Sequence, residues 1–204
     1  MARLNVNPTR MELKKLKARL ATATRGHKLL KDKSDEMVRK FTGLVKKNMA
    51  LRAEVEKELG ATLRSFSVAR SVTPVYRAET AFSMPVANVS AECGTGCIMG
   101  VDIPEIIVKG DAGKGLPYAF PEMTSEADAA VREAGRLLPK MIELAETEKT
   151  VRLLAAEIER NKRRVNALEY VMIPQLEETI AYIKGKLDEN ERAAIIRLMK
   201  VKQR

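Results

Sequence analysis

The chain has 204 residues and a net charge of +10, with no Trp and only 4% aromatic residues. A globular core of this size usually holds more large aromatic side chains, whereas the thin seam between two helices needs mainly aliphatic ones. The composition therefore argues against an ordinary globular domain and favours long helices or a coiled coil.

Residues 1–70 are predicted to form one long helix. Thr9 and Glu12 make a capping-box pattern, in which the hydroxyl accepts from a backbone amide and the carboxylate reaches back. The expected seam then advances in steps of three and four through Leu13, Leu16, Leu20, Ala23, His27, Leu30, Ser34, Met37, Phe41, Leu44, Asn48, Leu51 and Val55. A register held over this length implies a left-handed coiled coil with a partner helix. Beyond Val55 the register is expected to slip, in the manner of a stutter, to Leu59, Leu63 and Phe66.

Residues 71–124 differ in composition, because five of the eight prolines fall there together with many of the glycines. β-leaning runs lie between them at 72–76, 97–101 and 106–108. We expect a small β-containing excursion, such as one hairpin, with mobile loops.

Two short patterns within this segment hint at chemistry. Cys93 and Cys97 are the only cysteines, and their spacing is compatible with half a zinc site, a strained disulfide or ordinary thiols. Free thiols are favoured, since no other Cys and only one distant His could serve as ligands. The run Gly110–Gly115 resembles a phosphate loop, but its glycine spacing is wrong and Gly115 replaces the Ser or Thr that would bind magnesium. We expect a flexible turn there.

Residues 125–204 are predicted to form the second long helix, with Ser125 and Asp128 as a plausible cap. The expected apolar positions are Val131, Ala134, Leu138, Met141, Ala145, Val151, Ala155, Ile158, Val165, Leu168, Met172, Leu176, Ile180, Ile183, Leu187, Ala194, Leu198 and Val201. Pro139 and Pro174 each remove one backbone hydrogen bond. We expect them to bend the helix without ending it, because the pattern continues beyond both.

Two long helices joined by a compact excursion bury their apolar stripes most simply against each other. The predicted fold is therefore all-α dominated: a long antiparallel two-helix coiled coil with a small β-containing excursion between the helices. Its seam is expected to include Leu13, Leu16, Leu20, His27, Leu30, Phe41, Leu44, Leu176, Ile180, Ile183 and Leu187. His27 is interpreted as a polar seam residue that fixes register together with Ser34 and Asn48, with a pH switch as the alternative. Gly26 beside it suits the close approach of another chain.

The antiparallel arrangement brings both termini to one end, where the second helix should overhang. Residues 1–33 carry ten basic and two acidic side chains, and residues 192–204 carry five basic and no acidic ones. Such a tip repels itself, so we infer a partner there, either acidic or a polar sleeve. The predicted contact residues are Arg3, Arg10, Lys14, Lys15, Lys17, Arg25, Arg197, Lys200 and Lys202.

The sequence contains no pattern typical of an enzyme. It has no Ser-His-Asp set, no carboxylate dyad and no metal cluster, so no catalytic residue, cofactor or metal is expected. Residues 1–20 lack the apolar region of a signal peptide, and the most apolar stretch, 98–108, is too short and too interrupted to cross a membrane. We expect a soluble, cytoplasmic protein without direct membrane insertion.

Three stretches resemble the D subunit of the V-type and archaeal A-type rotary ATPases. They are NPTRMELKKLKARLATATRGHKLLKDKSDEMVRKF at Asn7–Phe41, IMGVDIPEI at Ile98–Ile106 and NALEYVMIPQLEETIAYIKGKLDENERAAIIRLMKVK at Asn166–Lys202. The middle stretch matches least well, and no role carries over to the cysteine pair.

The resemblance implies a non-catalytic rotor axle, or central stalk, that transmits torque between the catalytic head and the membrane ring. It further implies that the end with both termini enters the catalytic hexamer. The small F subunit of the stalk would pack beside the coiled coil, and the opposite end would meet the connector on the ring. The protein would then be a peripheral part of a membrane-bound complex that couples ion transport to ATP synthesis or hydrolysis.

Two other functions fit parts of the sequence. A basic coiled-coil arm that binds nucleic acid or another protein would account for the charge, but the chain lacks aromatic residues interleaved with basic ones for base stacking. A helical-hairpin adaptor or chaperone would need a hydrophobic, mobile tip, whereas the tip expected here is charged.

Overall fold

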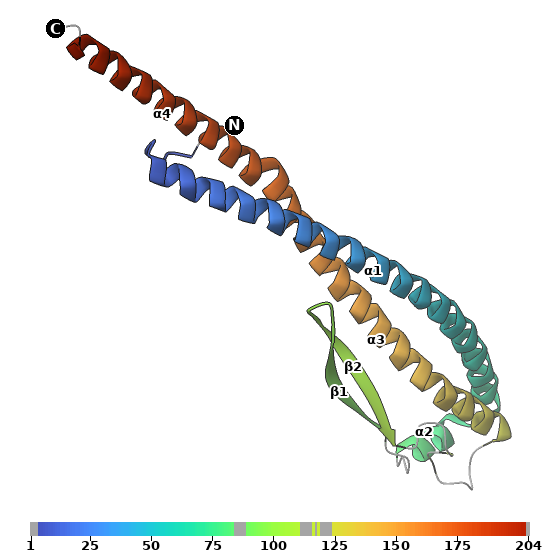
Figure 1. Cartoon of the computed structure of the whole chain (residues 1–204). Helices are drawn as coiled ribbons and strands as arrows, with labels where there is room; N and C mark the ends of the chain where they lie inside the picture. The colour runs from blue at the N-terminus through green and yellow to red at the C-terminus, as the bar shows by residue number, and fades with distance from the viewer. Residues whose placement is uncertain (1–3, 84–88, 111–115, 117, 119–123, 203–204) are drawn as a thin grey trace. The chain divides into compact units, whose positions relative to one another are not determined.

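The computed structural model describes residues 4–83, 89–110, 116, 118 and 124–202. The elements are α1 (Arg10–Val72), α2 (Val75–Ser83), β1 (Val89–Ile98), β2 (Val101–Gly110), α3 (Ser125–Ala167), the π-helical turn η2 (Leu168–Met172) and α4 (Ile173–Lys202). Figure 1 shows the long helix pair, with the two-stranded antiparallel sheet inserted in the chain between the helices. The predicted fold class is confirmed.

The chain divides into two compact units, each of which holds parts of both long helices. The first, here called the terminal unit, comprises Met1–Val38 and Ile158–Arg204 and contains both ends of the chain. The second, called the middle unit, comprises Arg39–Glu157 and contains α2 and the hairpin.

The start of α1 confirms half of the predicted capping box. The Thr9 hydroxyl accepts a hydrogen bond from the Glu12 amide at 3.2 Å, which satisfies one free donor of the first turn. The Glu12 carboxylate does not reach back to complete the box. It accepts instead from the Lys15 ammonium at 2.8 Å, one turn along the helix.

The terminal unit is held by an apolar seam. Leu16, Leu176 and Ile183 form its buried core, and Leu13, Leu20, Ala23, Ile180 and Leu187 pack against it. The residues that precede α1 run along α4, because the Leu4 amide donates to the Thr179 hydroxyl at 3.2 Å. Further along the pair, the buried Asn161 amide donates to the Met37 sulfur at 3.4 Å. These partners pair low residue numbers with high ones, as an antiparallel pair requires.

The middle unit corrects the expected stutter after Val55. Leu63 and Phe66 are 58% and 46% exposed, so they do not lie in the seam. Ala69 is buried, and the seam reaches it from Val55 by further steps of three and four through half-buried polar or small residues. The register does not slip: the large apolar side chains depart from the seam, while the heptad phase continues.

The face that α3 buries in this unit was also misjudged. Met141 is 42% exposed, and Ala134, Ala145 and Ala155 are exposed as well. The buried positions are Ala127, Ala130, Leu137, Thr147, Thr150 and Leu154. Two of them are threonines whose hydroxyls donate to carbonyls of their own helix, Thr147 to Glu143 and Thr150 to Glu146, at 2.8 and 2.9 Å. Because this local bond satisfies the hydroxyl, threonine can occupy a seam that an apolar pattern does not reveal.

The run 72–76, expected to be β-leaning, contains the junction of two helices. Thr73 and Pro74 separate α1 from α2, and the amide of Arg77 donates to the Pro74 carbonyl at 3.0 Å. Proline suits this place because the amide it lacks is one that the first turn of a helix leaves free.

The start of α3 is fixed differently from the expected Ser125 and Asp128 cap. The Asp128 amide donates to the Thr124 carbonyl, and the Thr124 hydroxyl bonds to that of Thr73 at 2.8 Å. The Asp128 carboxylate accepts from the hydroxyl of the buried Tyr118. Burial, together with this hydrogen bond, raises the pKa of the Tyr118 hydroxyl above its ordinary value.

The predicted hairpin is confirmed. β1 pairs with β2 from Val89↔Gly110 to Ile98↔Val101. The two residues of the turn, Met99 and Gly100, both have positive φ, which matches the right-handed twist of the flanking strands. Apart from Gly110 itself, the run Gly110–Gly115 lies outside the described residues.

Neither internal proline ends the second helix, as predicted, but Pro174 is preceded by a wide turn that was not anticipated. The Ile173 amide donates to the Leu168 carbonyl, five residues back, so the turn Leu168–Met172 is π-helical. Pro174 has no amide to donate to the Tyr170 carbonyl, and a wider turn accommodates the interruption. The expected seam residue Met172 is 40% exposed as a result.

Candidate functional site: surfaces for partner proteins

The terminal unit brings the predicted basic residues of both helices together. Lys14, Lys17, Lys200 and Lys202 are exposed there, whereas Arg3 lies outside the described residues. The other predicted contact residues already have partners within this unit. Arg10 forms an ion pair with Glu191 of α4, and Lys15 forms one with Glu12. Arg25 and Arg197 donate to backbone carbonyls of their own helices, those of Ala21 and Ala193. The positive surface is therefore carried largely by lysines, alongside arginines that are already engaged.

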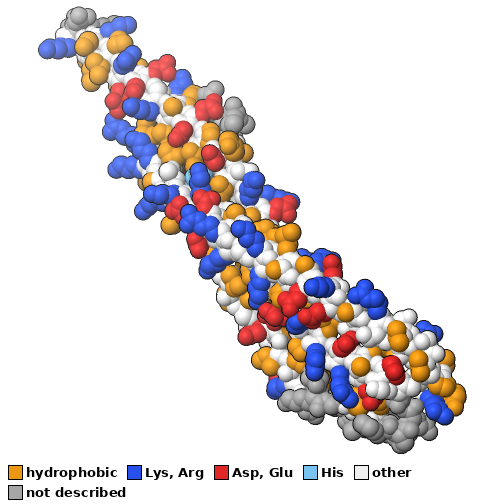
Figure 2. All heavy atoms as spheres, turned by 90° about the vertical axis from the view of Figure 1, so that its right-hand side faces the viewer, with side chains coloured by type: hydrophobic (Ala, Val, Ile, Leu, Met, Phe, Trp, Pro, Cys, Tyr) orange, Lys and Arg blue, Asp and Glu red, His pale blue; other side chains and the backbone are white. Residues whose placement is uncertain are grey.

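Acidic residues interrupt this basic surface. Lys186 and Glu189 form an ion pair at 2.8 Å, which raises the pKa of the lysine and lowers that of the glutamate. On the face that Figure 2 presents, acidic side chains lie between the Lys and Arg side chains, so the basic charge does not form one solid patch.

The end of α4 is also apolar, which the prediction of a charged tip missed. From Arg192 to Lys202 every side chain except that of Ala193 is exposed. The large apolar residues among them are Ile195, Ile196, Leu198, Met199 and Val201, each between 51% and 73% exposed. Figure 2 shows hydrophobic and basic side chains next to each other at this end. The density of aliphatic residues in the last turns was the available signal, but the seam prediction includes Leu198 and Val201 and gives no role to the other three.

His27 of α1 reaches across to η2 within the terminal unit. Its Nε2 lies 3.3 Å from Glu169 Oε2, and its side chain is 18% exposed. At Gly26 an added Cβ would meet nothing within 4 Å, so the described part of the chain does not approach that glycine closely. Asn48, the other polar residue proposed to fix register, has a buried side-chain nitrogen without a hydrogen-bond partner among the described residues.

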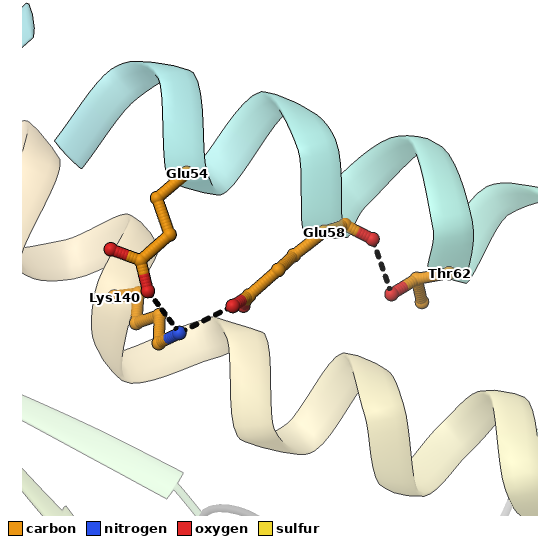
Figure 3. A network of polar contacts seen from close by, with 4 residues as sticks. All are labelled: Glu54, Glu58, Thr62 and Lys140. Atoms are coloured by element: carbon orange, nitrogen blue, oxygen red, sulfur yellow. Dashed lines mark hydrogen bonds and ion pairs between the residues drawn. The ribbon is translucent and has the colours of Figure 1, made fainter. Parts of the chain in front are cut away.

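The middle unit contains an ionic network between α1 and α3. Figure 3 shows Lys140 of α3 between Glu54 and Glu58, which lie one turn apart on α1. The Lys140 ammonium donates to the Glu54 carboxylate at 2.7 Å and also to that of Glu58. These two hydrogen bonds raise the pKa of Lys140. Because one cation binds two turns of the opposite helix, it resists sliding of either helix along the other.

Two more ion pairs extend this network along the unit. Lys47 pairs with Glu143 at 2.8 Å, and Arg52 lies 3.5 Å from Glu148. In each case α1 provides the cation and α3 the anion, whereas Lys140 reverses that polarity. The alternation favours one register, since a shift of the helices would bring like charges together.

The middle unit also has an apolar pocket of about 310 Å³ where α1, α2 and α3 meet. Phe66, Ala69, Val75, Ala127 and Val131 supply most of its lining. Phe66, which does not lie in the seam, lines this pocket instead. Pockets of this size with few polar groups suit an apolar side chain of a partner.

The cysteines are free thiols, as expected. Cys93 and Cys97 are both exposed and lie four residues apart on one strand, which separates them by about 13 Å. A disulfide needs Cα atoms closer than about 7 Å, so the two cannot be bridged within β1. Within the described residues, no three His, Cys, Asp or Glu side chains gather to hold a metal.

Comparison with known proteins identifies the family. The model of the family described as the D subunit of ATP synthase matches residues 12–203. The chain belongs to the ATP synthase D subunit family. It is 53% identical over 204 residues to the V-type ATP synthase D subunits of Thermoanaerobacter sp. (strain X514) and of Thermoanaerobacter pseudethanolicus (strain ATCC 33223 / 39E), with 100% of this chain and 98% of each relative covered. The V-type ATP synthase D subunit of Clostridium botulinum (strain ATCC 19397 / Type A) is 52% identical, with 98% of this chain and 94% of the relative covered.

Membership of the D subunit family makes the chain a central stalk subunit of a V/A-type ATPase. The alternative, a basic arm that binds nucleic acid, is not supported. In the described part of the chain, no helix combines the length and the apolar character that crossing a bilayer requires.

Proposed function

We propose that the chain transmits torque between the catalytic hexamer and the connector on the membrane ring and catalyses no reaction itself. It would act as a cytoplasmic, peripheral part of the membrane-bound complex. The antiparallel pairing of long helices supports this role, because an axle needs helices that brace each other against twisting.

The end of α4 carries the proposal that the terminal unit enters the hexamer. An exposed run of apolar side chains interspersed with lysines and arginines is costly in water unless a partner covers it. A sleeve with an apolar lining and acidic positions would match both components. Basic charge would orient the axle through long-range attraction, while the apolar contacts carry no direction and would permit sliding.

The middle unit supports the second half of the proposal. Torque displaces one helix of a pair along the other, and Lys140 with its two glutamates opposes that displacement. We assign the connector and the small F subunit to this unit, whose apolar pocket and exposed Leu63 and Phe66 offer them contact area.

Reconstitution with the hexameric head tests the function. The chain should form a stoichiometric complex with the hexamer and a small side subunit, and failure to do so would exclude the axle role. Within that complex, replacing Leu198, Met199 and Val201 by Ser should lower rotation coupled to ATP hydrolysis several-fold. Met49→Ser in the middle unit, 67% exposed, is the matched control and should leave coupling unchanged.

Charge reversal separates the two components of the tip. Reversed residues would be Arg3, Lys14, Lys15, Lys17, Arg197, Lys200 and Lys202. Coupling should weaken, more at low salt than at high salt, since screening removes the electrostatic part. Unchanged coupling in both the apolar and the charge-reversed variants would rule out the terminal unit as the part inside the hexamer.

A further inference from the structure

The hairpin has two outer edges, and the register shows which backbone groups lie on each. Opposite residues of an antiparallel pair alternate between those that exchange hydrogen bonds and those whose amides and carbonyls point outward. The Ile106 amide donates to the Glu146 carboxylate of α3 at 3.2 Å, so Ile106 and its partner Cys93 form an outward-pointing pair. Alternation then makes Thr95↔Pro104 outward-pointing as well, in agreement with the missing amide of Pro104.

The outer edge of β2 is therefore protected. Pro104 removes one of its outward amides, and Glu146 occupies another. Proline and a covering side chain are two of the devices by which proteins prevent pairing at a sheet edge. Figure 1 shows the hairpin alongside α3 in the middle unit, with β2 nearer to α3 than β1 is.

The outer edge of β1 has no such protection in the described structure. By the same alternation its outward groups belong to Ala91, Cys93, Thr95 and Cys97, and no third strand joins the sheet among the residues that the structure describes. Every residue of β1 is exposed except Gly96 and Ile98, which are partly buried. None of the residues with outward groups has a long side chain, so another backbone can approach along the whole edge.

The charge beside this edge indicates what kind of strand fits. Glu105 lies opposite Gly94, where an added Cβ would be 3.9 Å from the Cβ of Glu105. Over Gly96 the side chain of Ile103 lies closest, with its Cγ1 3.3 Å from the place of an added Cβ and Glu105 Oε2 4.0 Å from it. The missing side chain at Gly94 leaves the Glu105 carboxylate within reach of an incoming strand. The hairpin also carries Glu92 and Asp102 against a single cation, Lys109, which is paired with Glu92 at 2.6 Å. A second copy of the hairpin would bring further acidic charge to the same edge.

We propose that the outer edge of β1 binds an extended, basic segment of a different chain, which adds a third strand to the sheet and places a Lys or Arg beside Gly94 against Glu105. Backbone hydrogen bonds would supply affinity and the carboxylate would supply specificity, as in other cases of strand addition. This surface lies outside the end of α4 on which the proposed entry into the hexamer rests, so either proposal can fail without the other.

Amide hydrogen exchange on the full chain tests the proposal, with a ten-residue peptide that alternates Thr and Lys as the probe. The outward amides of Ala91, Cys93, Thr95 and Cys97 should exchange more slowly in its presence. A peptide that alternates Thr and Glu should have little effect. No slowing at about millimolar Lys peptide, or equal slowing by the Glu peptide, would overturn the proposal. Slowing that grows with protein concentration alone would overturn it too, because a second copy would then be the occupant.

Variants of β1 and β2 identify the contact. Thr95→Pro removes an outward donor but no bond within the hairpin, and should weaken peptide binding about fivefold, the value of one hydrogen bond. Thr95→Val keeps the amide and should bind like the wild type. Glu105→Gln should weaken binding more than Glu79→Gln, which makes the same charge change on α2. Equal affinities in Thr95→Pro and Thr95→Val, or in the two Gln variants, would contradict the assigned geometry. If Thr95→Pro unfolds the hairpin, the Gln pair alone decides.

Discussion

The terminal and middle units use different chemistry to hold the same two helices together. In the terminal unit a cluster of large aliphatic side chains around Leu16, Leu176 and Ile183 is buried. In the middle unit Val55, Leu137 and Leu154 are also buried, but the seam mixes them with alanines and threonines, and ion pairs from α1 to α3 flank it. An aliphatic seam is strong but indifferent to small shifts along the axis, whereas paired charges are weaker but specify the register. The helix pair thus obtains cohesion near its termini and register near the hairpin.

The largest expected effect comes from the phase of the apolar seam in the terminal unit. Seam residues before and after the wide turn, Leu168 and Leu176, are eight apart, where two regular steps would give seven. The turn Leu168–Met172 therefore absorbs one extra residue. Deleting Lys162 should rotate all that follows out of phase and expose Leu176 and Ile183, at a cost of several kcal/mol, about 2–5 for each large side chain lost from the core.

Deletion of Val171 within the turn is the matched variant. It should convert the turn to regular α-helix while both sides of the seam stay in phase, so the free energy of unfolding should fall much less. Urea unfolding followed by circular dichroism measures both variants. If the two deletions destabilise equally, the turn does not accommodate an extra residue.

A smaller effect distinguishes aliphatic from polar seam positions. Ile183→Ala should lower the free energy of unfolding by about 2–5 kcal/mol, because it leaves a cavity at a fully buried site. Thr150→Ala in the middle unit should cost about 1 kcal/mol or less, since its hydroxyl bonds only to its own helix. Ile196→Ala, 54% exposed, should be nearly neutral. Urea titration of the three variants gives the order, and equal losses at positions 183 and 150 would remove the contrast between the units.

The smallest effect concerns the ionic register of the middle unit. Lys140→Ala should destabilise the chain slightly, and added salt should remove the difference, because these carboxylates are largely exposed. The pKa of Lys140 is raised in the folded state, so its contribution is complete below the ordinary pKa of 10.5 and is lost as pH rises through the folded value. Unfolding curves at neutral and strongly alkaline pH measure this loss. Lys149 is an exposed lysine of the same helix, and the stability of Lys149→Ala relative to the wild type should depend on neither salt nor pH. If both variants show the same dependence, the effect comes from net charge alone.

The long helices and their antiparallel pairing could be predicted because apolar residues at steps of three and four carry that information directly. The prediction held best where the seam is aliphatic, as at Leu16 and Ile183. It was wrong after Val55, where Leu63 and Phe66 looked like a shifted seam but line a pocket with α3. A pattern of large apolar residues cannot show that a smaller residue such as Ala69 takes the buried place.

Other features were present in the sequence but were interpreted differently. The three consecutive steps of four from Leu168 to Ile180, with Pro174 among them, are the signal of the wide turn. The spacing of Ala194, Leu198 and Val201 predicts seam positions, although no partner helix lies opposite them among the described residues. Spacing identifies the face of a helix, but the length of its neighbour decides whether that face is covered.

The stretch of α4 from Arg192 to Lys202 would be a marginal helix in isolation, because so short a segment scarcely offsets its own ordering entropy in water. Its side chains are exposed, so the fold of the lone chain adds little to its stability. Before assembly this segment can fray, and its apolar residues can then associate with exposed apolar segments of other chains. The solubility of the newly made protein therefore depends on how quickly its partner subunits are made. The cell would therefore gain from producing this chain in step with the rest of the complex.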